Sequence, residues 1–328
     1  MRTPAFWHQK DSWNARMLLP FGALYYAAHR VRMRTTTPYR APIPVICVGN
    51  CVAGGAGKTP IVSALARILH ERGEVVHIIS RGYGGSIIKA TRVQTEVHHF
   101  DEVGDEPLLL ARSSPVWVGR DRRASIEAAH RAGATMIVMD DGFQNPTIQK
   151  DISFLVVDGA YGTGNGRMIP AGPMREPFVQ ALARADVLVL MGKDDTLLIH
   201  NVPRATTLLR AEIVPTIPDA VRDVPLIAFA GIGRPDKFFT MLHKYALNVQ
   251  ETVAFSDHHP YSAEELMQLQ QRAHALGATL VTTEKDWVRF DASSRASIVA
   301  IPIEVRTHPD SRLTDMLDVL LANLEYSS

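Results

Sequence analysis

The sequence contains little cysteine. Cys47 and Cys51 are the only two in 328 residues, and no further Cys or His stands near them at the spacing of a zinc site. A single close pair does not form the disulfide framework of a small secreted domain. The cysteine content therefore argues against a structural zinc site and against a disulfide, and it favours a reducing compartment.

Long hydrophobic runs are also absent. The most continuous one, residues 17–28, has twelve residues, and arginines flank it at 16, 30, 32 and 34, whereas a membrane-spanning helix needs about 20 apolar residues. No small-residue cleavage site follows, which disfavours a signal peptide. With its Trp and Tyr residues the segment predicts an amphipathic helix on an anionic membrane surface. The alternative is a helix packed on the body of the protein.

The net charge of +1 conceals an asymmetry along the chain. Residues 1–40 carry seven Lys and Arg residues against Asp11, a net +6, which leaves −5 for the remainder. This basic arm predicts an anionic partner. No interleaving of aromatic and basic residues is found elsewhere, so the expected partner is not a nucleic acid.

The most informative stretch is residues 43–60. An apolar, β-branched run at 43–48 predicts a buried strand, and a helix is predicted over 61–69. The Gly-rich turn between them lets successive backbone N–H groups face phosphate oxygens at a helix N-terminus. Lys58 would reach the β- and γ-phosphates, and the Thr59 hydroxyl would bind Mg²⁺. The predicted nucleotide-binding residues are Gly54, Gly55, Ala56, Gly57, Lys58 and Thr59.

Val52 occupies a position where the usual phosphate-binding pattern has a glycine. The alternative interpretation is therefore a glycine turn before a helix, with a solvated Lys58. The order of strand, loop and helix favours the phosphate-binding loop.

Further candidate residues follow other predicted strands. The strand at 136–139 ends at Asp140 and Asp141, where a P-loop enzyme has the aspartate that supports Mg²⁺. Arg81 and Tyr83 follow the strand at 75–80, and ligands bind at such strand ends, although a plain glycine turn explains these residues equally well. The Gly/Pro-rich segment around Arg175 is long enough to predict a functional loop that contacts phosphate.

Three other features are ambiguous from the residues alone. Arginines at 120, 122 and 123 open a predicted helix, where cations oppose the helix dipole, so an anion facing them would explain their presence. Asp105 and Glu106 fit a helix N-cap as well as a catalytic pair. His258 and His259 precede another helix, where capping is the ordinary role, but a cleft between two lobes would favour function.

The chain is longer than one hydrophobic core usually supports, which predicts more than one lobe. We expect an α/β fold, with a mostly parallel sheet of the P-loop NTPase type flanked by helices, a second smaller α/β lobe and an N-terminal amphipathic helix. The expected domains are 1–40, 41–200 and 201–328. The segment at 283–286 (TEKD) has the wrong order for the guanine-binding motif of GTPases.

Taken in order, the motifs resemble those of one family, the tetraacyldisaccharide 4'-kinases (lipid A 4'-kinases), from the N-terminal arm to the closing helix. The motifs are VGN at 48–50, GGAGKTP at 54–60, RGYG at 81–84, GDEP at 104–107, DDGFQ at 140–144, PAGPMRE at 170–176, DH at 257–258 and TEKD at 283–286.

The resemblance implies a kinase that transfers the γ-phosphate of ATP to the 4'-hydroxyl of an acylated glucosamine disaccharide 1-phosphate. The product would be lipid IVA, in the biosynthesis of lipid A and lipopolysaccharide. The implied location is the cytoplasmic face of the bacterial inner membrane, with the enzyme peripheral or monotopic.

The resemblance also implies residue roles. Asp105 would take the proton from the sugar hydroxyl, and His258 would pair with Asp105. Glu106 and Thr59 would hold Mg²⁺, and Asp140 and Asp141 would support the nucleotide–metal site. Contacts to substrate or phosphates would come from Asn50, Tyr83, Arg120 or Arg123, Gln144 and Arg175.

Two positions depart from the family pattern, which usually has His where Asn145 stands and Thr where Val52 stands. Asn145 is not a proton carrier at neutral pH, so we assign it no acid/base role. The alternative functions are another P-loop kinase or ligase, or a membrane-associated P-loop ATPase or nucleotide switch. Ala53 stands where such switches usually carry Lys before the Gly-Gly pair, which disfavours the last reading.

Overall fold

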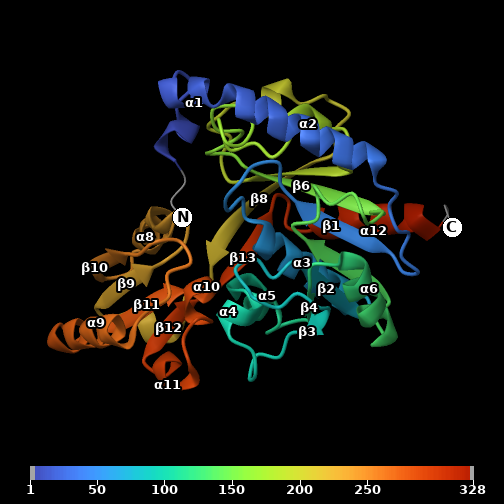
Figure 1. The fold of residues 1–328 in the computed structure, drawn as a ribbon. Coiled ribbons are helices and arrows are strands. Elements are labelled where there is room, and N and C mark those ends of the chain that lie inside the picture. The colour runs from blue at the N-terminus through green and yellow to red at the C-terminus, as the bar shows by residue number, and fades with distance from the viewer. Residues whose placement is uncertain (1–3, 326–328) are drawn as a thin grey trace.

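The computed structural model describes residues 4–325, so residues 1–3 and 326–328 of the expected terminal domains lie outside the described part. Its larger sheet has nine strands in the order β13-β8-β7-β6-β1-β5-β2-β4-β3 (Figure 1). Seven of them run parallel: β1 (Val45–Gly49), β2 (Val76–Ser80), β4 (Val116–Val118), β5 (Met136–Asp140), β6 (Ile152–Asp158), β7 (Val187–Met191) and β8 (Leu208–Pro215). The edge strands β3 (Thr91–Arg92) and β13 (Ile303–Thr307) are antiparallel. The mostly parallel α/β fold is thus confirmed.

Helices cover both faces of this sheet, which explains why its central strands are apolar throughout. In β1, Ile46 and Val48 face one hydrophobic cluster, whereas Val45 and Cys47 face the other. The first cluster includes α3 (Lys58–Glu71), α5 (Asp105–Leu110) and α12 (Arg312–Glu325); the second includes α6 (Arg122–Arg131) and α7 (Phe178–Leu182). The short helices α4 (Phe100–Val103) and η2 (Leu198–Asn201) lie in the connections.

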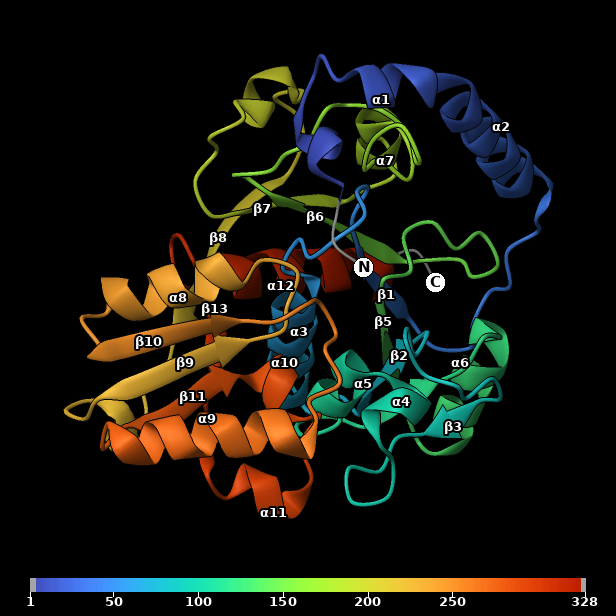
Figure 2. The same cartoon turned by 60° about the vertical axis from the view of Figure 1, so that its left-hand side comes forward.

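A second, four-stranded parallel sheet forms the smaller lobe, in the order β10-β9-β11-β12 (Figure 2). Its strands are β9 (Leu226–Ala230), β10 (Val249–Ala254), β11 (Thr279–Thr283) and β12 (Ile298–Ile301). Ala228 and Ala230 pack with α8 (Pro235–Lys244), and Ile227 and Phe229 pack with α9 (Ala263–Ala275). The remaining short helices are η3 (Asp219–Val221), α10 (Glu284–Trp287) and α11 (Ala292–Arg295).

The boundary between the lobes differs from the expected domains 41–200 and 201–328, which would place it at residue 200. Strand β8 follows that position yet pairs with β7, and β13 pairs with β8 in the larger sheet. Pro302 separates β12 from β13, which follow each other directly in the chain yet belong to different sheets. Proline has no N–H for a central ladder, which explains the break. The chain therefore returns to the first lobe, where α12 ends it.

The N-terminal arm contains η1 (Ala5–His8), α1 (Trp13–Met17) and α2 (Leu19–Thr35), and α2 lies across the loops that follow β6 (Figure 1). The arm is attached to those loops: the Trp7 indole N–H donates to the Pro170 carbonyl at 3.0 Å. At Gly22 the helix comes so close that a Cβ would lie 3.1 Å from the Met168 carbonyl oxygen. The other side of α2 exposes a stripe of apolar side chains at Phe21, Leu24 and Val31, and Met17 at the end of α1 is exposed as well.

The arm therefore packs on the body of the protein, one of the two alternatives that the sequence left open, and it also exposes an apolar face. Its binding to a membrane surface stays a prediction. Among residues 4–325, no helix has both the length and the apolarity needed to cross a membrane.

Candidate active site

The phosphate-binding loop joins β1 to α3, as predicted. Gly57, the N-cap of α3, has a positive φ of 83°, a conformation that is strained for residues with a side chain. Buried Asn50 donates from its side-chain amide to the Gly54 carbonyl at 3.2 Å, so it shapes the loop. Lys58 and Thr59 lie in the first turn of α3, and the Lys58 ammonium is 3.6 Å from Asp141.

The loop around Arg175 runs beside the start of the phosphate-binding loop. The Ala53 N–H donates to the Pro173 carbonyl at 2.7 Å, and the Arg175 N–H donates to the Cys51 carbonyl at 2.8 Å. Val52 lies between these contacts, is buried, and forms an antiparallel bridge with Met174. Backbone pairing and burial therefore hold this part of the loop, which explains how it accommodates Val52 in place of glycine.

Asp141 follows β5 and faces the same edge as the phosphate-binding loop, because β1 and β5 are parallel neighbours. One nitrogen of Arg175 contacts its two carboxylate oxygens at 2.8 and 2.9 Å. Burial alone would raise the pKa of Asp141, but the charges of Lys58 and Arg175 lower it to about 2. The prediction that Arg175 contacts phosphate stays untested, and the structure shows it paired with Asp141.

Asp140 has a different environment. One oxygen accepts from the Ser80 hydroxyl at 3.3 Å, while Oδ1 is buried without a hydrogen-bond partner among the described residues. Burial and the negative charge of Glu106 raise the pKa of this carboxyl to about 7. A buried, unpartnered carboxylate oxygen beside further acids suits a hard cation. No cluster of three or more metal-ligating side chains occurs in residues 4–325, but Mg²⁺ usually takes only one or two carboxylates plus phosphate and water oxygens.

The buried arginine at this edge is Arg122, whereas the family resemblance implied Arg120 or Arg123. Arg123 is exposed, pairs with Glu127 at 2.8 Å and lies over the Tyr39 ring, and the Arg120 residue is also exposed. Arg122 is buried instead, and its guanidinium donates to the Asp140 carbonyl at 3.3 Å. Helical periodicity in the sequence could have indicated this burial. Arg122 shares the buried face of α6 with apolar residues four and seven positions later, Ile126 and Ala129.

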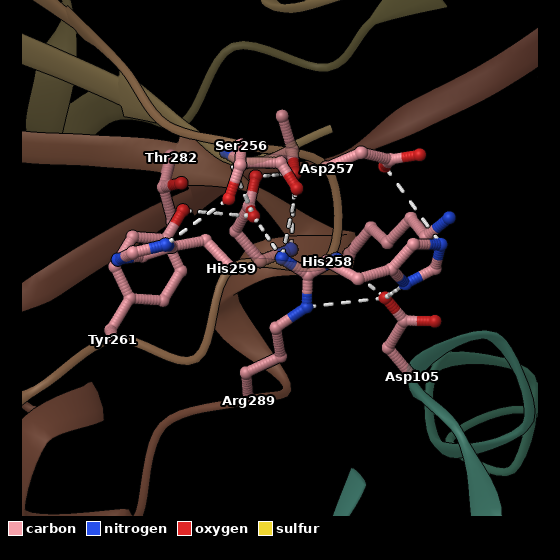
Figure 3. A network of polar contacts seen from close by, with 12 residues as sticks. Asp105, Ser256, Asp257, His258, His259, Tyr261, Thr282 and Arg289 are labelled. Carbon is pink, nitrogen blue, oxygen red and sulfur yellow. Dashed lines mark hydrogen bonds and ion pairs between the residues drawn. The ribbon is translucent and has the colours of Figure 1, made fainter. Parts of the chain in front are cut away.

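The second cluster joins the two lobes around Asp105 (Figure 3). Nδ1 of His258 lies 2.9 Å from Oδ2 of Asp105, and Arg289 donates to the same oxygen, from Nε at 3.1 Å and from a terminal nitrogen at 2.5 Å. Oδ1 accepts the backbone N–H of Glu106 at 2.9 Å. The Glu106 carboxylate in turn is 3.1 Å from the Lys285 ammonium.

Electrostatics keep Asp105 ionised. Burial would raise its pKa, but the hydrogen bond from His258 and the charges of Lys285 and Arg289 lower it well below the usual range. An ionised carboxylate only accepts hydrogen bonds, so His258 Nδ1 carries the proton in this contact.

The neighbouring histidine has another role. His259 contacts Glu265 through Nε2 at 2.9 Å and stacks on Phe255, with ring centroids 4.8 Å apart. The two histidines therefore have different partners: His258 contacts the first lobe, and His259 contacts its own lobe.

The other predicted site residues have mixed placements. Tyr83 is 72% exposed, with its ring centroid 6.0 Å from that of His258. Gln144 donates to the Asn50 carbonyl at 2.7 Å and to Glu176 at 2.9 Å, so it connects the loops around the site. The Asn145 side chain accepts from the backbone N–H and the hydroxyl of Thr147 at 2.7 Å within a turn.

The sequence motifs missed Arg289 and assigned no role to the members of TEKD. The Arg289 side chain is 1% exposed and connects Asp105 to Asp286, 2.7 Å away. Asp286 also accepts from the Gly231 N–H and the Tyr261 hydroxyl. The TEKD segment therefore builds the second lobe's side of the site: Lys285 contacts Glu106, and Asp286 holds Arg289.

Comparisons with known proteins agree with one another. A family model described as tetraacyldisaccharide-1-P 4'-kinase matches residues 14–322. A protein of Rhodospirillum centenum with the name tetraacyldisaccharide 4'-kinase is 47% identical over 99% of this chain and 97% of its own length. One of Dinoroseobacter shibae with the same name is 46% identical, over 98% of each chain. A crystal structure of LpxK from Aquifex aeolicus in complex with ATP superposes with a TM-score of 0.76 at 26% identity, covering 93% of this chain and 99% of that one.

Proposed function

This chain belongs to the tetraacyldisaccharide 4'-kinase family, and from that premise we propose how its residues carry out the transfer of phosphate from ATP. The observation that carries the proposal is the Asp105–His258 contact. Through it, a histidine of the second lobe orients an ionised carboxylate of the first lobe. Asp105 accepts the proton of the attacking 4'-hydroxyl, and His258 positions Asp105.

The two oxygens of Asp105 are not equivalent. Three donor nitrogens, one from His258 and two from Arg289, lie on Oδ2, whereas Oδ1 accepts a backbone N–H. Oδ1 accepts a single hydrogen bond and keeps a lone pair for the sugar hydroxyl, whereas Oδ2 is fully occupied. We therefore assign proton acceptance to Oδ1.

A base with a lowered pKa fits this reaction. Phosphoryl transfer passes through a loose transition state, in which the bond to the attacking oxygen is only partly formed. The hydroxyl proton therefore leaves late, and the chemistry requires an ionised, positioned acceptor more than a strong base. His258 and Arg289 supply both conditions.

ATP, the phosphate donor, binds at the loop over residues 54–59. Backbone N–H groups at the start of α3 and the Lys58 ammonium neutralise the triphosphate. Asp141 holds Lys58 and Arg175 on this side of the loop. Bound Mg²⁺ would add charge neutralisation, and Thr59, Asp140 and Glu106 would hold it; the unpartnered Asp140 Oδ1 supports that assignment.

The arm fits a lipid acceptor whose acyl chains stay in the bilayer. We infer that the exposed stripe on α2 lies in an anionic membrane surface, on the cytoplasmic face of the inner membrane, with arginines 30, 32 and 34 near the headgroups. Arg30, Arg34 and Arg184 line a hollow of about 150 Å³ beside the helix, which adds positive charge there.

A direct assay tests these roles. The protein is incubated in detergent with labelled ATP and the acylated disaccharide 1-phosphate, and the expected product is the bisphosphorylated lipid. Replacing Lys58 by Ala should abolish both ATP binding and product, whereas replacing Asp105 should abolish product alone. If the Asp105 variant forms product at the wild-type rate, the base assignment is wrong.

A further inference from the structure

Besides the cluster around Asp105, another group of charges connects the two lobes. It lies on the side of the phosphate-binding loop away from Asp140. Asp158 ends β6, the neighbour of β1 opposite to β5. Arg234, the N-cap of α8 in the second lobe, forms an ion pair with Asp158, and the Lys237 ammonium lies 2.7 Å from the same oxygen. The Arg234 guanidinium also donates to the Gly55 carbonyl at 3.3 Å.

The contact with Gly55 matters because this loop has few other restraints. A side chain placed at Gly54 or at Gly55 would meet no atom within 4 Å. Two side-chain donors hold the carbonyls there: Asn50 from the first lobe on Gly54, and Arg234 from the second lobe on Gly55. Without them the glycine peptides are free to rotate, since glycine adopts positive and negative φ about equally.

Holding the carbonyl of Gly55 fixes the next N–H. In a trans peptide the C=O and the following N–H point in opposite directions. With its carbonyl bound to Arg234, the peptide between Gly55 and Ala56 directs the Ala56 N–H away from the second lobe's arginine. A preoriented N–H group is what a phosphate-binding loop requires.

Asp158 is a firm anchor for the arginine. Its side chain is 8% exposed, and its Oδ1 accepts the Ala160 N–H at 3.0 Å in the turn after β6. The Arg234 guanidinium lies 5.7 Å from the centroid of the Tyr161 ring in the same turn. Both charges of the Arg234–Asp158 pair are partly buried. Removing one partner would leave the other with less compensating charge, which is unfavourable.

We propose that Arg234 is a positioning residue for ATP, which holds the Gly55–Ala56 peptide in its phosphate-binding orientation from the second lobe, with Asp158 as its anchor. ATP binding and the contact between the lobes then stabilise each other, because a coupling between two equilibria is reciprocal. The inference rests on ATP binding at this loop and is independent of the assignment of Asp105.

The test is nucleotide affinity in the full-length protein. Arg234→Gln should raise the Kd and KM for ATP about tenfold, the effect of losing one charge-assisted hydrogen bond. The KM for the disaccharide and kcat at saturating ATP should change less than about threefold, because Asp105 and its partners are untouched. Arg222→Gln is the matched control, since Arg222 pairs with Asp219 within its own lobe.

Two further variants distinguish positioning from general stability. One terminal nitrogen of Arg234 contacts both the Gly55 carbonyl and Asp158. Arg234→Lys keeps the charge but lacks the planar guanidinium that directs this nitrogen, so ATP affinity should remain reduced. Asp158→Asn should act in the same direction, and its effect should not add to that of Arg234→Gln. The proposal is overturned if Arg234→Lys and Arg234→Gln both bind ATP within twofold of the wild type, or if kcat falls as much as ATP affinity.

Discussion

His258 and Asp105 are 153 residues apart in the chain, yet their side chains meet at 2.9 Å between the two lobes. His258 reaches this position from a left-handed backbone conformation, with φ at 56°, and its own N–H donates to the Gly231 carbonyl at 3.0 Å. Arg289 and Lys285 reach Asp105 and Glu106 from the same lobe. The Asp105 carboxylate therefore has its full set of partners only when the lobes are together.

The first prediction concerns the base. Asp105→Asn keeps the shape of the side chain but removes the charge that we propose as the proton acceptor. We expect turnover to fall about 10²–10⁴-fold, the usual contribution of general base catalysis. The measurement is initial rate at saturating ATP and acceptor, with ATP affinity determined separately and expected to persist. Asp101→Asn, an exposed change in α4, is the control; a normal rate for Asp105→Asn would exclude the role.

The second prediction compares the two neighbouring histidines. Both contact a carboxylate at 2.9 Å, but only His258 contacts one in the first lobe. His258→Gln should lower kcat about 10-fold or more, because Asp105 loses a partner that orients it. His259→Gln should leave kcat unchanged and lower stability by at most about 1 kcal/mol, the range of a partly exposed ion pair. Equal losses of kcat in both variants would contradict the assignment.

These contacts show what the sequence was able to predict. The phosphate-binding loop was predictable because β1, the glycines and α3 are consecutive, and each has a local signature. Strand β8 was missed because its burial alternates irregularly, in a stretch that had been placed at the start of another lobe. Arg122 was recoverable from helical periodicity, whereas Arg289 was not: it acts on a residue 184 positions away, and no local pattern encodes that distance.

The third prediction concerns stability. Arg289 lies buried between the carboxylates of Asp105 and Asp286. Arg289→Met should reduce the free energy of unfolding by about 3–5 kcal/mol, because two buried carboxylates lose their cation. Urea denaturation measures this change. Arg272→Gln removes a more exposed pair with Glu251 and should cost at most about 1 kcal/mol. A similar small loss in Arg289→Met would show that water replaces the guanidinium.

The fourth prediction concerns pH. Burial would raise the pKa of Asp158, but hydrogen bonds and charges from Lys237 and Arg234 lower it overall, below its ordinary 3.8. A lowered folded-state pKa means that the unfolded chain binds the proton more readily, so this stabilisation is present above about pH 4 and disappears as the pH falls further. The difference in unfolding free energy between wild type and Asp158→Asn should therefore be constant from pH 7 to 5 and shrink below pH 4. A difference that grows on acidification would contradict the sign.

The fifth prediction concerns the membrane surface. Deleting residues 1–35 would disturb more than membrane binding, because Trp7 and Gly22 pack on the loop that carries Arg175. Point substitutions in the exposed stripe separate the two effects. Phe21→Asp together with Leu24→Asp should weaken binding to vesicles of anionic phospholipid more than tenfold, since each buried apolar side chain contributes about 1.5–3 kcal/mol.

The same double variant should keep its rate on acceptor dispersed in detergent, because the packed face of α2 is unchanged, and should lose rate on acceptor in vesicles. Val319→Asp is the control: it is equally exposed, on α12, whose apolar residues pack on the opposite face of the sheet. Flotation of vesicles with bound protein measures binding, and labelled ATP measures the rate. If Phe21→Asp/Leu24→Asp floats with the vesicles as the control does, α2 does not enter the membrane surface and the arm serves only to support the Arg175 loop.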